Sequence, residues 1–166
     1  VRETVAPITV GVHRSTANKS FLDMHYWLKL SGRKNNAFFL AIYDTGLANI
    51  DPRDPNLPEM WKARVLRECM INPWYFLREI VRIPDTGGVV GSGVRYKLDR
   101  GNLALNFGFC NNWNMFLELP RQFGKTTSAL CWYLWVFNFK ATNSEIMFMN
   151  KKHEDSKMNL ARLKNL

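Results

Sequence analysis

The chain has 166 residues, and 23 Lys and Arg against 14 Asp and Glu give a formal net charge of +9 at pH 7. Hydrophobic residues make up 46% and charged residues 22%, which is typical of a folded globular protein and excludes a disordered, collagen-like or acidic-tail chain. The length suits one domain, and 11 Phe, 6 Trp and 5 Tyr predict a core rich in aromatic rings. The positive charge indicates either a polyanionic partner or a solvated basic surface.

The three cysteines, Cys69, Cys110 and Cys131, are far apart and contain no CxxC pair. We therefore expect reduced cysteines in an intracellular protein, without a disulfide framework or a zinc site. The first residues show no charged leader followed by an apolar run, so no signal peptide is expected. The longest apolar stretch, 129–137, is far shorter than the roughly 20 residues that a membrane-spanning helix needs.

The first half of the chain predicts mainly helices. The expected elements are a strand or extended arm at 4–12, helices at 18–30, 59–70 and 74–81, and a proline-rich break at 51–58. Ser15 or Asn18 is expected to cap the first helix. Asn72 and Pro73 predict a helix start, because Asn suits the cap and Pro suits the first turn.

Glycines between 85 and 93 predict a flexible connection, so we divide the chain into a mainly helical region at 1–92 and an α/β domain at 93–166. In the second region the expected elements are helices at 99–110, 125–139 and 153–166 and buried strands at 113–119 and 144–150. Strands that alternate with helices predict a parallel sheet flanked by helices. Two strands do not complete such a sheet, so we expect it to be unfinished in this sequence.

One motif carries clear chemistry: LPRQFGKT at 119–126, followed by Thr127, between a predicted strand and a predicted helix. This is the context of a phosphate-binding Walker A loop, whose backbone N–H groups and helix N-terminus converge on an anion. Gly124 would let the backbone approach phosphate, Lys125 would reach the β- and γ-phosphates, and the Thr126 hydroxyl would ligate Mg²⁺. The usual first glycine is replaced by Leu119. The alternative is an ordinary strand–helix turn with an exposed lysine.

The segment RQFGKTT at 121–127 resembles the variant Walker A loop of large terminase subunits, the ATP-driven motors that package DNA into tailed-phage capsids. The stretches 72–84, 100–105 and 150–166 are also similar to those around that loop. The resemblance implies a P-loop NTPase core with a parallel sheet, ATP and Mg²⁺ as cofactors, and double-stranded DNA as a partner. It further implies a portal and a small terminase subunit as partners, a homo-oligomeric ring without a membrane, and the cytoplasm of an infected bacterium.

The resemblance also implies roles for single residues. Arg121 would act with Lys125 in catalysis, since a guanidinium at the loop stabilises charge that develops on the γ-phosphate. Its alternative role is a surface pair with Glu118. The other residues expected at the nucleotide are Gln122, Phe123, Gly124, Thr126 and Thr127 at the phosphates, and Asn102 with Arg100 at the adenine. Asn102 could equally cap or decorate its helix, and the aromatic residues at 74–76 could stack on a base or fill the core.

No hydrophobic strand that ends in Asp, with a catalytic Glu beside it, follows Thr127, and Glu145, Glu154 and Asp155 do not fit this pattern. We therefore expect weak nucleotide binding and no steady hydrolysis by this chain alone. The leading interpretation is the N-terminal part of a DNA-packaging ATPase. The alternatives are another P-loop nucleic-acid motor, such as a helicase, and a non-catalytic nucleic-acid- or capsid-binding module with a vestigial phosphate loop.

Overall fold

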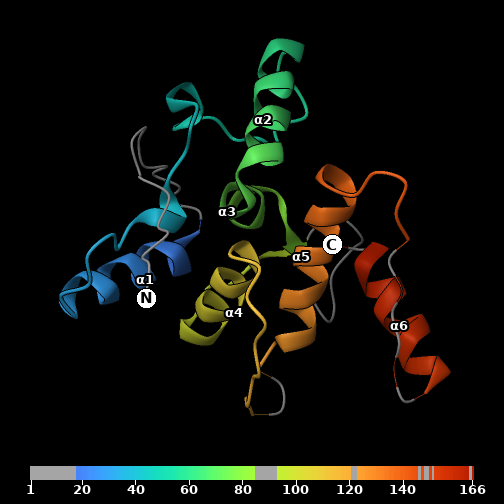
Figure 1. The fold of residues 1–166 in the computed structure, drawn as a ribbon. Coiled ribbons are helices and arrows are strands. Elements are labelled where there is room, and N and C mark those ends of the chain that lie inside the picture. Colours follow the sequence, from blue (N-terminus) through green and yellow to red (C-terminus); the bar gives the residue numbers. More distant parts are fainter. Residues whose placement is uncertain are drawn as a thin grey trace. The chain divides into compact units, whose positions relative to one another are not determined.

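The computed structural model describes residues 18–84, 93–120, 123–145, 147, 150, 152–164 and 166, and most of them are helical (Figure 1). The elements in chain order are α1 Lys19–Leu30, η1 Phe38–Leu40, η2 Thr45–Leu47, α2 Glu59–Ile71, α3 Pro73–Tyr75, η3 Phe76–Ile80, β1 Arg82–Ile83, β2 Val94–Arg95, α4 Arg100–Cys110, α5 Lys125–Phe139 and α6 His153–Lys164.

The chain divides into two compact units. Unit 1 is Val1–Ile80 with Lys97–Asp99, and unit 2 is Val81–Tyr96 with Arg100–Leu166. The sequence places a boundary between residues 92 and 93, whereas unit 2 already begins at Val81. The described part of unit 2 contains β1, β2 and the last three α-helices.

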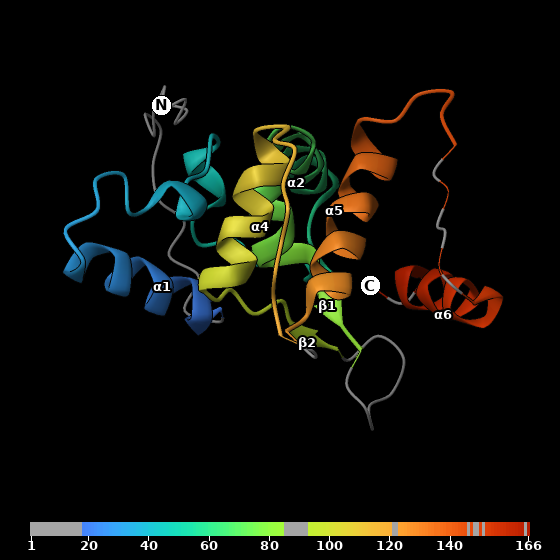
Figure 2. The same cartoon turned by 60° about the horizontal axis from the view of Figure 1, so that its bottom comes forward.

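The predicted parallel sheet is wrong. Among the described residues the strands form one two-stranded antiparallel sheet, in which Arg82 lies opposite Arg95 and Ile83 opposite Val94 (Figure 2). Each strand has two residues, so the described part of the chain is mostly helical. The α/β P-loop NTPase core that the sequence predicts is therefore not the architecture of this structure.

The strand predicted at 113–119 does not form, for a physical reason. A strand is stabilised by hydrogen bonds to a neighbouring strand, and residues 113–119 have no such neighbour in the described part of the chain. This segment runs without regular structure, and Phe116 is 95% exposed instead of buried. In the segment 144–150, the residues described are not in a strand, and Met147 is exposed; the others lie outside the described residues.

The helix predictions are largely confirmed. Helices α1, α2, α4, α5 and α6 lie within one or two residues of the predicted ranges. The side chain of Asn72 caps α3, since its Oδ1 accepts a hydrogen bond from the Tyr75 N–H at 3.1 Å. The predicted helix at 74–81 lies at 73–80, where three α-helical residues of α3 pass directly into the π-type turn η3. Residues 4–12, Ser15 and the glycine-rich connection at 85–92 lie outside the described residues.

Aromatic rings fill the core of unit 1, as the composition predicts. Phe21 of α1 packs against Phe39 of η1 with ring centroids 6.0 Å apart, and Trp74 of α3 lies 6.2 Å from Phe39. Asn18 does not cap α1 with its side chain. Its Nδ2 instead donates to the Arg78 carbonyl oxygen at 2.9 Å, which links the start of α1 to η3.

A buried carboxylate holds the segment after η1 against α2. Glu68 is 1% exposed, and its two carboxylate oxygens accept from the backbone N–H groups of Tyr43 and Asp44, each at 3.0 Å. The side-chain Nδ2 of Asn72 also donates to Glu68, at 2.8 Å. One side chain therefore supplies the acceptor for three donors from two separate parts of unit 1.

We predict that Glu68→Ala lowers the free energy of unfolding by about 3 kcal/mol, because it leaves buried donors without an acceptor. Urea denaturation followed by circular dichroism measures this change. The control is Glu59→Ala on the same helix, whose carboxylate is 87% exposed and pairs with Lys62; its effect should stay within about 0.5 kcal/mol. Equal effects of the two substitutions would contradict the role given to Glu68.

Candidate phosphate-binding loop

The turn into α5 is made by a glycine in the left-handed conformation. Gly124 is the N-cap residue of α5, with φ +77° and ψ 13°, in the left-handed region that glycine adopts without strain. Because glycine has no side chain, no side-chain oxygen of the cap competes for the first N–H groups of the helix. These groups lie at the positive end of a 15-residue helix.

Lys125 folds back over the loop. Its Nζ donates to the carbonyl oxygen of Leu119 at 2.9 Å and to that of Pro120 at 2.6 Å. The ammonium group is thus held at the start of the loop by two neutral acceptors, and no carboxylate is among these two partners. Arg121 and Gln122 belong to this loop but lie outside the described residues.

The remaining loop residues differ in exposure. Thr126 is exposed and Thr127 is half-buried on the first turn of α5. Phe123 packs over Gly101 of α4, where an added Cβ would overlap atoms of the Phe123 ring. Phe123 therefore anchors the loop on α4, and Gly101 provides the space for it.

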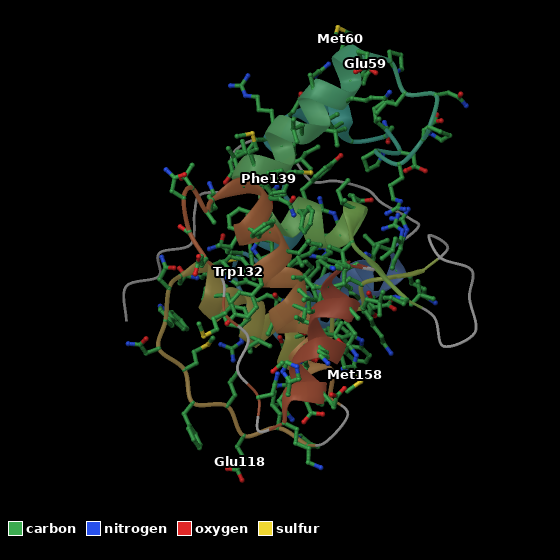
Figure 3. The ribbon with its side chains drawn as sticks, turned by 90° about the vertical axis from the view of Figure 1, so that its right-hand side faces the viewer. Glu59, Met60, Glu118, Trp132, Phe139 and Met158 are labelled. Atoms are coloured by element: carbon green, nitrogen blue, oxygen red, sulfur yellow. The ribbon has the colours of Figure 1, made fainter. Side chains whose placement is uncertain are left out.

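Helices α4 and α5 lie side by side (Figures 1 and 2). Trp132, labelled on α5 in Figure 3, stacks on Phe109 of α4 with ring centroids 5.6 Å apart. The predicted burial of α5 holds for one side of the helix only, because Tyr133 and Phe137 are exposed. Apolar contacts thus fix the distance between the two helices.

A chain of hydrogen bonds connects the same two helices one turn beyond the loop. Ser128 of α5 donates from Oγ to Oδ1 of Asn102 at 2.9 Å. The Tyr96 hydroxyl lies 2.8 Å from Ser128 Oγ and accepts from Nδ2 of Asn106 at 2.8 Å. Since the Ser128 proton is used on Asn102, the Tyr96 hydroxyl donates to Ser128. All four side chains are buried.

The residues expected at the adenine do not lie together on one side of α4. Asn102 is buried, and its side-chain oxygen accepts from Ser128, whereas Arg100 is exposed at the first position of the helix. Residues two apart on a helix face different directions. The aromatic residues at 74–76 are all buried in unit 1, which agrees with the core interpretation.

The acidic residues considered from the sequence are on the surface. Glu118 and Glu145 are exposed, and Glu118 is labelled on the segment that leads into the loop in Figure 3. Glu154 lies 3.7 Å from Lys157 on α6 in an exposed pair. Within the described ranges no group of three or more His, Cys, Asp and Glu residues could hold a metal ion.

Burial raises the pKa of each cysteine thiol, Cys69, Cys110 and Cys131, to about 12. These thiols are therefore protonated at neutral pH and are poor nucleophiles. All three cysteines are free thiols in the structure. No helix in the described part of the chain has the length and apolar character needed to cross a bilayer.

Sequence reasoning missed Ser128, Tyr96 and Asn106. The available signal was the spacing of Asn102 and Asn106, which places two amides on the same side of α4, and a serine inside an apolar helix. Comparisons of the chain with family models, with curated proteins and with solved structures gave no match.

We predict that Ser128→Ala lowers the free energy of unfolding by about 1–3 kcal/mol, because it leaves the Asn102 oxygen and the Tyr96 hydroxyl without their shared partner. Chemical denaturation measures the change. Ser144→Ala is the matched control, since Ser144 is exposed and its hydroxyl donates to the nearby Thr142 carbonyl. If Ser128→Ala is as mild as Ser144→Ala, the hydrogen-bond chain does not stabilise unit 2.

Proposed function

We propose that the loop at 119–127 binds the phosphates of a nucleoside triphosphate together with Mg²⁺. The observation that carries this proposal is the combination of a left-handed Gly124 and a Lys125 ammonium folded over the loop at the start of α5. Backbone N–H groups, the positive helix end and the ammonium would all act on one anion. None of these features depends on a parallel sheet.

The bound phosphates would exchange partners with the loop. Lys125 would give up the carbonyl oxygens of Leu119 and Pro120 for phosphate oxygens, which form stronger charge-assisted hydrogen bonds. Thr126 is exposed at the start of α5, and its hydroxyl would ligate Mg²⁺. The nucleotide supplies the phosphoryl group, and the loop supplies positive charge around it.

We further propose that this chain belongs to a viral DNA-packaging ATPase of the large-terminase kind, which would hydrolyse ATP in the complete protein to move double-stranded DNA. The resemblance of the loop and of its flanking stretches supports this assignment, and so does the net charge of +9. A portal, a small subunit and a ring of identical copies would be its partners. A phosphate-binding module without hydrolysis is the alternative, and ATPase measurements on the complete protein separate the two.

Lys125→Ala should weaken Mg²⁺–ATP binding by about 10- to 100-fold, the effect of losing a hydrogen bond to a charged group worth about 1.5–3 kcal/mol. Isothermal titration calorimetry measures the affinity, and circular dichroism should show an unchanged fold. Lys164→Ala, at an exposed position on α6, is the matched control and should bind as the unaltered chain does. An unchanged affinity of Lys125→Ala would refute the phosphate-loop proposal.

In the complete enzyme, Arg121→Ala should lower kcat by roughly 10²-fold with a smaller change in KM. A guanidinium aimed at the γ-phosphate acts most strongly where charge develops in the transition state. Arg121→Lys should restore part of the rate, because a point charge lacks the planar fork of arginine. Steady-state kinetics decide the matter, and a raised KM with unchanged kcat would mean that Arg121 only holds the nucleotide.

A further inference from the structure

An aromatic and basic surface lies on α1 and the turn after it, in unit 1. We define it as the α1 surface, formed by Tyr26, Trp27, Lys29, Leu30, Arg33 and Lys34, all of which are exposed. The exposed fractions of Tyr26, Trp27 and Leu30 are 56%, 63% and 60%. Large apolar side chains gathered at this exposure often mark a binding site.

This exposure does not come from a loosely packed helix. The opposite face of α1 is buried through Phe21 and Met24, and Phe21 packs against Phe39. The core of unit 1 therefore already holds one face of α1. Tyr26, Trp27 and Leu30 occupy the outward face, where a solvated helix usually carries polar residues.

The turn after α1, which carries Arg33 and Lys34, has a defined backbone. Gly32 has φ +72°, and the N–H groups of Gly32 and Arg33 donate to the carbonyl oxygens of Lys29 and Leu28 at 3.0 and 3.1 Å. This is the Schellman pattern of a helix end. The side chain of Asn36 donates to the Arg33 carbonyl at 3.0 Å, so the backbone at Arg33 is fixed on both sides.

The two rings are both more than half exposed. Tyr26 and Trp27 have ring centroids 6.0 Å apart with an interplanar angle of 68°, which is an edge-to-face arrangement. Such a contact occupies at most one face of one ring, so a flat, unsaturated ring can stack on a face turned to solvent. Three cations, Lys29, Arg33 and Lys34, lie within six residues of chain beside them.

We propose that the α1 surface binds single-stranded nucleic acid, with bases stacked on Trp27 and Tyr26 and phosphates paired with Lys29, Arg33 and Lys34. Aromatic platforms beside cations are the chemistry by which unpaired bases and their backbone are held. A duplex would satisfy the cations but would offer no unstacked base to the rings. A bilayer fits less well, because the continuous apolar face of α1 is already buried in unit 1. This surface is separate from the phosphate loop, and the proposal does not depend on it.

Fluorescence anisotropy of the whole chain with a labelled oligothymidylate of about 20 nucleotides tests the proposal, with an abasic strand of the same length as the second probe. The combined change Tyr26→Ala and Trp27→Ala should weaken oligothymidylate binding by roughly 10-fold and leave abasic binding almost unchanged. Arg33→Glu with Lys34→Glu should weaken both probes. It should also make the negative slope of log affinity against log salt concentration less steep, by about 0.7 for each lost phosphate contact.

Matched controls are Trp113→Ala, a half-exposed tryptophan of unit 2, and Lys152→Glu with Lys164→Glu, which makes the same change in charge. Both should bind as the unaltered chain does. Trp27→Leu keeps an apolar side chain and should still lose base-dependent affinity. The proposal fails if the abasic strand binds as tightly as oligothymidylate, if a duplex of equal length binds more tightly, or if vesicles with anionic lipid are preferred.

Discussion

The hydrogen-bond chain from Asn106 through Tyr96 and Ser128 to Asn102 is the constraint on which the candidate phosphate site depends. Apolar contacts are not directional, and α5 is apolar over most of its surface. Stacking on α4 therefore holds α5 close without fixing its rotation about its own axis. The Ser128 hydroxyl, buried between two partners, Asn102 on α4 and Tyr96 before it, selects one rotation. That rotation determines where Lys125 and Thr126 lie at the open end of the helix.

Local sequence signals predict the helices and their ends, because those depend on neighbours in the chain. Asn72 before Pro73 and Gly124 before Lys125 are examples in which one residue type decides the backbone. Local signals could not decide in the same way whether residues 113–119 form a strand. Its apolar composition indicates burial, but a strand also needs a partner strand, which a single segment does not specify. Phe116 is consequently exposed where a buried strand was predicted.

The loop itself was accessible to sequence reasoning, because Gly, Lys and Thr act through neighbouring atoms. Its support was not, because the bonds of Ser128 to Asn102 and to Tyr96 join residues 26 and 32 positions apart. The same holds for Glu68, whose partners Tyr43 and Asp44 lie 25 and 24 positions away. Burial of such polar side chains is decided by which elements meet, and spacing along the chain does not contain that information.

In the hydrogen-bond chain between α4 and α5, the side chain of one asparagine acts as a donor and the side chain of the other as an acceptor. Both protons of the Asn106 amide are used, one on the Tyr96 hydroxyl and one on the Asn102 carbonyl, while its Oδ1 accepts from no group in the described structure. Asn102 contributes an acceptor to Ser128 instead. A carboxylate in place of Asn102 would keep that acceptor, whereas a carboxylate in place of Asn106 would set negative charge against two oxygens. The two asparagines, one helical turn apart, therefore differ in the substitutions that their hydrogen bonds permit.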